Sequence, residues 1–114
     1  MTLGEWGENL AAQFLKKKGY LIVERNFRCK MGEVDIIALD GAKLVFVEVK
    51  TRTSQAFGLP CEAVNKTKIQ HIKRTANYYM AIHSSSYKDA RIDVIEILRS
   101  EGKAYLRQTR NVTG

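Results

Sequence analysis

Residues 32–50 read GEVDIIALDGAKLVFVEVK, which is two apolar runs joined by a short polar turn. Asp40 and Gly41 in this turn form a dipeptide that favours a tight β-hairpin. The stretch therefore predicts two antiparallel strands, near 33–39 and 43–50. Charged residues occupy the strand ends farthest from the turn. A charge in such a strand is costly unless a partner compensates it, so these residues are the first candidates for function.

The turn determines which residues of the hairpin lie opposite each other. A two-residue loop at Asp40-Gly41 places Glu33 directly opposite Glu48. Because side chains alternate between the two faces of a strand, Asp35 and Lys50 project to the same side as this pair. Asp35 and Glu48 then become diagonal neighbours, roughly 7–8 Å apart at the backbone. A three-residue loop would instead send Asp35 to the opposite face.

Several carboxylates on one face of a sheet repel one another, so this face requires a counter-charge. Lys50 is one candidate, and a bound divalent cation is another. Mg²⁺ in proteins is usually held by one or two carboxylates together with water and phosphate oxygens. Asp35 and Glu48 can offer that ligand set. The alternative is a salt-bridged, solvated sheet surface without a ligand.

The chain is strongly basic for its size. Its 114 residues include 19 Lys and Arg against 12 Asp and Glu, a formal net charge of +7. This length suits one domain, residues 1–114, and the basic balance favours nucleic acid as a partner. An acidic cluster would repel phosphate groups unless a metal ion bridged the two. Because no apolar run reaches the length of a membrane span, we expect no membrane partner. Residues 1–10 lack a signal pattern, and Cys29 and Cys61 suggest no disulfide framework, so we expect a cytoplasmic location.

The flanking sequence predicts two helices and three further strands. Thr2 begins the first helix with a capping box, and the lysines at 16–18 followed by Gly19 end it. Gly4 and Gly7 in this helix suit close packing on the sheet. Apolar residues recur at helical spacing over 61–82, which predicts the second helix. The remaining strands are predicted at 20–27, 91–98 and 103–108, and we expect the tail after Thr109 to fray.

This order predicts an α/β domain with a mixed sheet of about five strands and flanking helices. The hairpin makes the centre of the sheet antiparallel, and the long helix can return the next strand in parallel. Four basic residues, at the ends of the predicted strands or on the second helix, are candidate contacts to nucleic acid: Arg28, Arg52, Lys66 and Lys73. A solvated exterior is the alternative for them. For Tyr78 and Tyr79, packing is favoured over base stacking.

Asp35 followed by Glu48-Val49-Lys50 resembles the PD-(D/E)xK signature of the restriction-endonuclease-like nuclease superfamily, with Val34 where the written motif has proline. Residues 32–38 and 45–52 more narrowly resemble the YraN-like uncharacterised bacterial family. Gly4-Glu5-Trp6-Gly7-Glu8 and Arg91-Ile92-Asp93-Val94 match the same family, so the resemblance covers nearly the whole chain. It implies an endonuclease-like fold similar to archaeal Holliday junction resolvases, whereas the family itself has no demonstrated activity.

The resemblance also implies roles for individual residues. Asp35, Glu48 and the backbone carbonyl of Val49 would bind Mg²⁺ or Mn²⁺, and Lys50 would orient water or stabilise charge on the phosphate. Glu8, at the margin of the first helix's apolar stripe, would complete the acidic site. A solvent-exposed Glu8 that favours the helix dipole is the alternative.

Two functions from different classes remain open. One is a metal-dependent nuclease acting on DNA, with branched or damaged DNA among the candidate substrates. The other is a nucleic-acid-binding module of the same fold that does not cleave or needs a partner to do so. A structural protein whose charged face joins protomers is a remoter option. Resolvase-like relatives act as dimers, so a homodimer is a further expectation.

Overall fold

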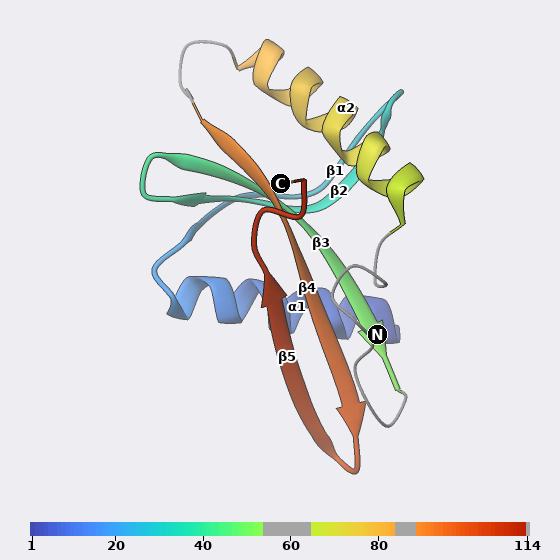
Figure 1. Ribbon diagram of the computed structural model, residues 1–114. Coiled ribbons are helices and arrows are strands. Elements are labelled where there is room, and N and C mark those ends of the chain that lie inside the picture. The colour runs from blue at the N-terminus through green and yellow to red at the C-terminus, as the bar shows by residue number, and fades with distance from the viewer. Residues whose placement is uncertain (54–64, 84–88, 114) are drawn as a thin grey trace.

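A single five-stranded sheet separates two helices in the computed structural model, which describes residues 1–53, 65–83 and 89–113 (Figure 1). The strands lie in chain order across the sheet, and all neighbours are antiparallel except β3 and β4. The predicted α/β class and mixed sheet are therefore confirmed. The elements are α1 (Leu3–Lys17), β1 (Leu21–Cys29), β2 (Gly32–Asp40), β3 (Lys43–Arg52), α2 (Lys66–Ile82), β4 (Ala90–Ser100) and β5 (Lys103–Thr109).

Each helix covers one face of the sheet and closes its own apolar core. On the α1 face, Ala11 and Leu15 of the helix pack with a cluster that includes Ile36, Val45 and Ile95 of the strands. A separate cluster on the α2 face joins Ile72, Ala76 and Tyr79 to Phe46 and Val94, among others. Both faces of the central strands are thus buried, which is why 44–47 read as a continuous apolar run.

The predicted capping box of the first helix is present. Thr2 accepts a hydrogen bond from the backbone N–H of Glu5, and the Glu5 side chain accepts one in return from the backbone of Thr2. The second helix begins at Lys66 with Asn65 as its cap, later than the predicted residue 61. Residues 61–64, and most of the loop expected between 51 and 60, lie outside the described part of the chain.

The hairpin turn differs from the predicted one. Asp40 pairs with Lys43, so the loop is Gly41-Ala42 rather than Asp40-Gly41. Gly41 supplies the left-handed backbone of this loop, with φ at 63°. Asp40 remains in the strand, where its carboxylate accepts a hydrogen bond from Arg91 at 3.1 Å. Every partner shifts by two residues, which keeps side chains on their predicted faces because the period of a strand is two.

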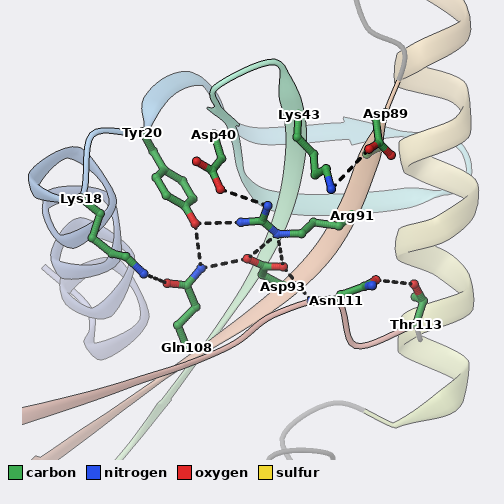
Figure 2. A network of polar contacts seen from close by, with 11 residues as sticks. Lys18, Tyr20, Asp40, Lys43, Asp89, Arg91, Asp93, Gln108, Asn111 and Thr113 are labelled. Atoms are coloured by element: carbon green, nitrogen blue, oxygen red, sulfur yellow. Dashed lines mark hydrogen bonds and ion pairs between the residues drawn. The ribbon is translucent and has the colours of Figure 1, made fainter.

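A polar network links side chains of β2, β4 and β5 to Lys18, the residue that follows α1 (Figure 2). Its centre is Asp93, fully buried, which accepts hydrogen bonds from Arg91 at 3.0 Å and from Gln108 at 2.8 Å. The backbone N–H of Asn111 donates to the same carboxylate at 2.9 Å. The predicted fraying after Thr109 is therefore wrong for 110–113, because the chain turns back to satisfy this buried charge.

Candidate functional site

The site predicted from the hairpin lies where the pairing between β2 and β3 ends. The last recorded pair is Ile36 with Val47, and Asp35 is the next residue outward. Its carboxylate Oδ2 accepts a hydrogen bond from the backbone N–H of Val49 at 2.7 Å. On the other side of β2, Asn26 of β1 lies opposite Asp35 and has a left-handed φ of 56°. Asp35 thus occupies an irregular step of the sheet.

Glu48 lies directly opposite Asp35 when this register is continued by one step. The prediction that Glu33 lies opposite Glu48, with Asp35 diagonal to Glu48, is therefore wrong, because the turn is displaced. The Glu48 side chain is 13% exposed, and its nearest ion-pair partner among the described residues is Lys68, with Nζ 3.8 Å from Oε2. Two carboxylates consequently share one partly enclosed position at the end of the ladder.

Burial and the neighbouring charge of Asp35 raise the pKa of Glu48 to about 8. The charge of Lys68 acts in the opposite direction, but it does not offset these two effects. A hydrogen bond links the carboxyl groups of Glu48 and Asp35. Near neutral pH, Glu48 is therefore mostly protonated and can donate this hydrogen bond to Asp35. A pair of this kind is electrostatically suited to exchange its proton for a cation.

Glu8 approaches the same region from α1. Its side chain is 21% exposed, and Oε1 lies 3.9 Å from a guanidinium nitrogen of Arg25. Burial raises the pKa of Glu8, as does the charge of Asp35, whereas Arg25 lowers it. Asn26 also forms a hydrogen bond with the Glu8 side chain. Glu8 is therefore close enough for the charge of Asp35 to raise its pKa.

Gly7 allows α1 to come close to β3 at this point. A Cβ atom on Gly7 would overlap the hydroxyl of Thr51 and lie 3.0 Å from its Cβ. Gly4 has no such neighbour, since the nearest atom to its added Cβ is 3.9 Å away. The expected close packing through glycine thus applies to Gly7 alone, and this packing sets the position of the adjacent Glu8.

Asp35 and Glu48 fit the requirements of a small divalent cation. Mg²⁺ needs only one or two protein carboxylates, because water and phosphate oxygens complete its shell. The pair supplies two carboxylates, and the Val49 carbonyl would be the third protein ligand. No three His, Cys, Asp or Glu side chains within the described ranges form a ready-made metal-binding group. Glu8 interacts electrostatically with Asp35, and its direct ligation of a metal ion stays a prediction.

The other predicted site residues are spread around this pair. Lys50 is exposed in β3 and is on the same face as Glu48 by alternation. Arg28 pairs across the β1–β2 ladder with Glu33, at 3.0 Å, on an exposed surface. Arg52 is half-buried at the end of β3. Lys66, the first residue of α2, is exposed.

Lys73 is exposed on α2 and lines a small hollow with Phe46 and Ala90, at the opposite end of β3 from Lys50. The structure therefore does not gather the four predicted nucleic-acid contacts into one patch. No helix in the described ranges is both long and apolar enough to cross a bilayer.

Comparison with known sequences places this chain in a family. The model of the uncharacterised protein family UPF0102 matches residues 7–97. The chain belongs to UPF0102. A UPF0102 protein of Caldicellulosiruptor bescii is 55% identical over 96 residues, covering 83% of this chain and 81% of the relative. Another, from Caldanaerobacter subterraneus subsp. tengcongensis, is 48% identical over 111 residues, covering 97% and 91%. The predicted YraN-like family is confirmed.

Three residues around the acidic pair of this UPF0102 chain were missed as site residues in the sequence. Lys68 is the counter-charge of Glu48, Arg25 is that of Glu8, and Asn26 provides the left-handed step opposite Asp35. Asn26 carried a detectable signal, because asparagine interrupts the strand pattern and tolerates a positive φ. The two cations carried none, since their role depends on contacts between distant elements.

Proposed function

We propose that this UPF0102 chain is a metal-dependent nuclease that hydrolyses phosphodiester bonds, with DNA as its substrate. The observation that carries the proposal is the Asp35–Glu48 pair itself. Its two carboxyl groups share a hydrogen bond in a partly buried position, where Lys68 at 3.8 Å compensates them only in part. Such a pair is costly in a structure without a ligand, and it suits a site that takes up a cation.

Mg²⁺ or Mn²⁺ is the ion that this donor set suits. Asp35, Glu48 and the Val49 carbonyl would hold it, with Glu8 as a nearby negative charge. When bound, such an ion supplies Lewis-acid polarisation of a phosphate oxygen and a more acidic water. It also neutralises the acidic pair, so that a phosphate group can approach a site that would otherwise repel it.

Other groups of the chain would stabilise the phosphate, orient Asp35 and attract the nucleic acid. The Lys50 ammonium, exposed on the face that carries Glu48, stabilises negative charge as it develops on the phosphate. The hydrogen bond from the Val49 N–H holds the Asp35 carboxylate in one orientation, so that its second oxygen is available to a ligand. Basic residues elsewhere on the surface attract the nucleic-acid backbone.

A nucleic-acid-binding module without cleavage is the second candidate function. The observation that favours it is the absence of a three-residue metal-binding group among the described residues. A site with two carboxylates could require a further ligand from a partner protein or from a second copy of the chain. The predicted homodimer bears on this question, and sedimentation of the purified protein checks it.

The test is incubation of the protein with plasmid, flapped and four-way-junction DNA, and with matched RNA, in Mn²⁺. We expect cleavage of DNA that is lost in Asp35→Asn and Glu48→Gln. Glu24→Gln is the matched control, because Glu24 is an exposed carboxylate of β1 and is no part of the pair. Cleavage that survives both site substitutions would exclude the proposed site. Salt-sensitive binding without cleavage would favour the binding module.

A further inference from the structure

Two hollows are lined by residues of α2 and of the tip of the β1–β2 hairpin, and these two elements cross each other in the view of Figure 1. The first, of about 240 Å³, is lined by residues that include Arg28, Lys68 and His71. The second, of about 500 Å³, is lined by Phe27, Tyr78 and Ile82 among others, and again by Arg28. Because Arg28 and Cys29 border both hollows, we treat them as one trough, which we call the α2 trough.

One end of the α2 trough is lined by Lys68, the ion-pair partner of Glu48, and the other end by Tyr78 and Phe27. Lys68, which lines the first hollow, lies 3.8 Å from Glu48. At the other end, the Tyr78 ring stacks on Phe27 with centroids 6.5 Å apart and planes at 30°. Tyr78 is 40% exposed, and Ile82, one turn farther along α2, is 53% exposed. A ring supported on one side and open to solvent on the other is a surface on which a flat group can stack.

The two adjacent tyrosines, Tyr78 and Tyr79, differ in their exposure to solvent. Tyr79 is 2% exposed and belongs to the core, as expected from the sequence. Tyr78 was assigned to packing too, but its outward half is not needed by the core. The trough therefore presents an exposed aromatic side chain and an exposed aliphatic side chain from neighbouring turns of α2.

Positive charge lines the route between the two ends of the trough. The Arg28 side chain is 75% exposed at the boundary of the two hollows, and Lys30 borders the second. Arg74 is exposed on α2 one turn before Tyr78, at the spacing that places side chains next to each other on a helix. Glu33 is the acidic residue on the lining, and it is paired with Arg28 at 3.0 Å.

We propose that the α2 trough binds the unpaired nucleotides of a nucleic-acid strand. A base stacks on Tyr78 beside Ile82, and the backbone phosphates follow Arg28 toward Lys68. Alternating cations and aromatic faces are how proteins hold single strands, because every base has a flat face and every linkage a phosphate. Paired bases in a duplex are already stacked and cannot enter. The trough therefore selects substrates with unpaired bases beside the scissile linkage.

The inference rests on the proposed function for its second half, the delivery of the strand to Asp35 and Glu48. Its first half, recognition of unpaired bases, is testable without metal or cleavage. Binding is measured in EDTA by fluorescence anisotropy, with three labelled probes of equal length. These are a single-stranded oligodeoxynucleotide, its blunt duplex, and a single strand in which abasic sites replace the bases.

Three variants separate stacking from folding. Tyr78→Leu keeps an apolar contact with Phe27 but removes the ring, and Tyr78→Phe keeps the ring. Tyr105→Leu is the matched control, because Tyr105 is a 47% exposed tyrosine on β5, across the sheet from β1. The melting temperature of each variant is recorded, so that a loss of binding is interpreted only in folded protein.

We expect Tyr78→Leu to weaken binding of the single strand by about 10-fold. Tyr78→Phe and Tyr105→Leu should retain it, and neither the duplex nor the abasic strand should respond to the Tyr78 substitutions. An equal loss on all three probes, or no loss on the single strand, would overturn the proposal. A loss in Tyr105→Leu as large as that in Tyr78→Leu would overturn it too.

A photocrosslinking measurement locates the base directly. A single strand carrying 5-iododeoxyuridine is irradiated with the protein, and the adduct is mapped by mass spectrometry. We expect the adduct on Tyr78, and an adduct confined to other segments would contradict the trough. Stacking on Tyr78 in a protein that never cleaves DNA would leave the trough intact while refuting the nuclease. Cleavage that neither depends on Tyr78 nor requires unpaired bases would support the nuclease and refute the trough.

Discussion

Two pairs of enclosed carboxylates in the described part of the chain are compensated very differently. Asp93 and Glu96 on β4 are both fully buried, and each meets an arginine: Arg91 at 3.0 Å and Arg107 at 2.8 Å. Asp35 on β2 and Glu48 on β3 are less buried, yet the nearest cation to Glu48 among the described residues is 3.8 Å away. The more deeply buried pair is thus the better neutralised one.

The contrast distinguishes structural acids from candidate ligands. Asp93 accepts hydrogen bonds from three groups, so nothing further is required of it. Glu48 instead shares its hydrogen bond with another carboxyl group, and its pKa is raised to about 8. Burial and sequence type alone would rank Asp93 and Glu96 as the stronger site candidates. Compensation by neighbouring cations reverses that ranking.

The largest expected effect concerns the compensated pair. Arg91→Ala leaves Asp93 buried without its cation and removes the contact to Asp40, so we expect a loss of about 3–5 kcal/mol in the free energy of unfolding. Lys43→Ala is the control, because it breaks an exposed ion pair with Asp89 and should cost less than about 1 kcal/mol. Urea denaturation measures both. A similar small effect for the two variants would show that Asp93 is not held by Arg91.

The position of Glu8 near Asp35 depends on Gly7. Gly7→Ala forces its new Cβ against Thr51, so we expect a destabilisation of about 2–3 kcal/mol. Gly4→Ala has room for its Cβ and should instead stabilise the helix by up to about 1 kcal/mol. Thermal unfolding of the two variants checks the opposite signs. Equal behaviour at the two positions would mean that α1 does not approach β3 at Gly7.

The pH dependence of the free energy of unfolding should reveal the raised pKa of Glu48. The pKa of Glu48 is raised from 4.5 to about 8, so the folded protein holds a proton that the unfolded chain has released. This contribution is fully present below pH 4.5 and is lost as the pH rises to 8. Glu48→Gln should therefore stabilise the protein by up to about 4 kcal/mol at pH 8 and change little at pH 4. Stability of Glu48→Gln that follows the wild-type pH profile would contradict the assigned pKa.

A bound divalent cation should offset the destabilisation that ionised Glu48 causes beside Asp35. At a Mg²⁺ concentration 10 times its dissociation constant, we expect binding to stabilise the native protein by about 1.4 kcal/mol. The increase in melting temperature should be absent in Glu48→Gln and Asp35→Asn and present in Glu24→Gln. Calorimetry at pH 7 should also detect a proton released as the ion binds, because Glu48 must lose its proton to become a ligand. An equal thermal shift in all variants would place the ion elsewhere.

Most of the fold was predictable from the sequence because its signals are local. The capping box at Thr2 and the apolar periodicity located α1, and the runs at 33–39 and 43–50 located the central hairpin. The turn was displaced because Asp40 stays in the strand to meet Arg91, which is 51 positions away in the chain. The tail was misjudged for the same reason, since Asn111 binds Asp93. No periodicity reports such distant contacts.

The candidate site was predictable in its acids and not in their surroundings. Asp35 and Glu48 were selected from strand alternation and Glu8 from family resemblance, and the shift of two residues brings Asp35 and Glu48 opposite each other. Lys68 and Arg25 escaped notice because any exposed lysine or arginine looks alike in the sequence. Their meaning comes from the 3.8 Å and 3.9 Å approaches to Glu48 and Glu8, which tertiary packing creates.

Anomalous diffraction from crystals soaked in Mn²⁺ would show most directly whether the Asp35–Glu48 pair captures a cation. The account predicts one strong peak in contact with the carboxylate oxygens of both Asp35 and Glu48 and with the Val49 carbonyl, at about 2.0–2.2 Å as for hard divalent ions. A peak at Asp93, at Glu33 or on the surface alone, with the Asp35–Glu48 hydrogen bond intact, would contradict it.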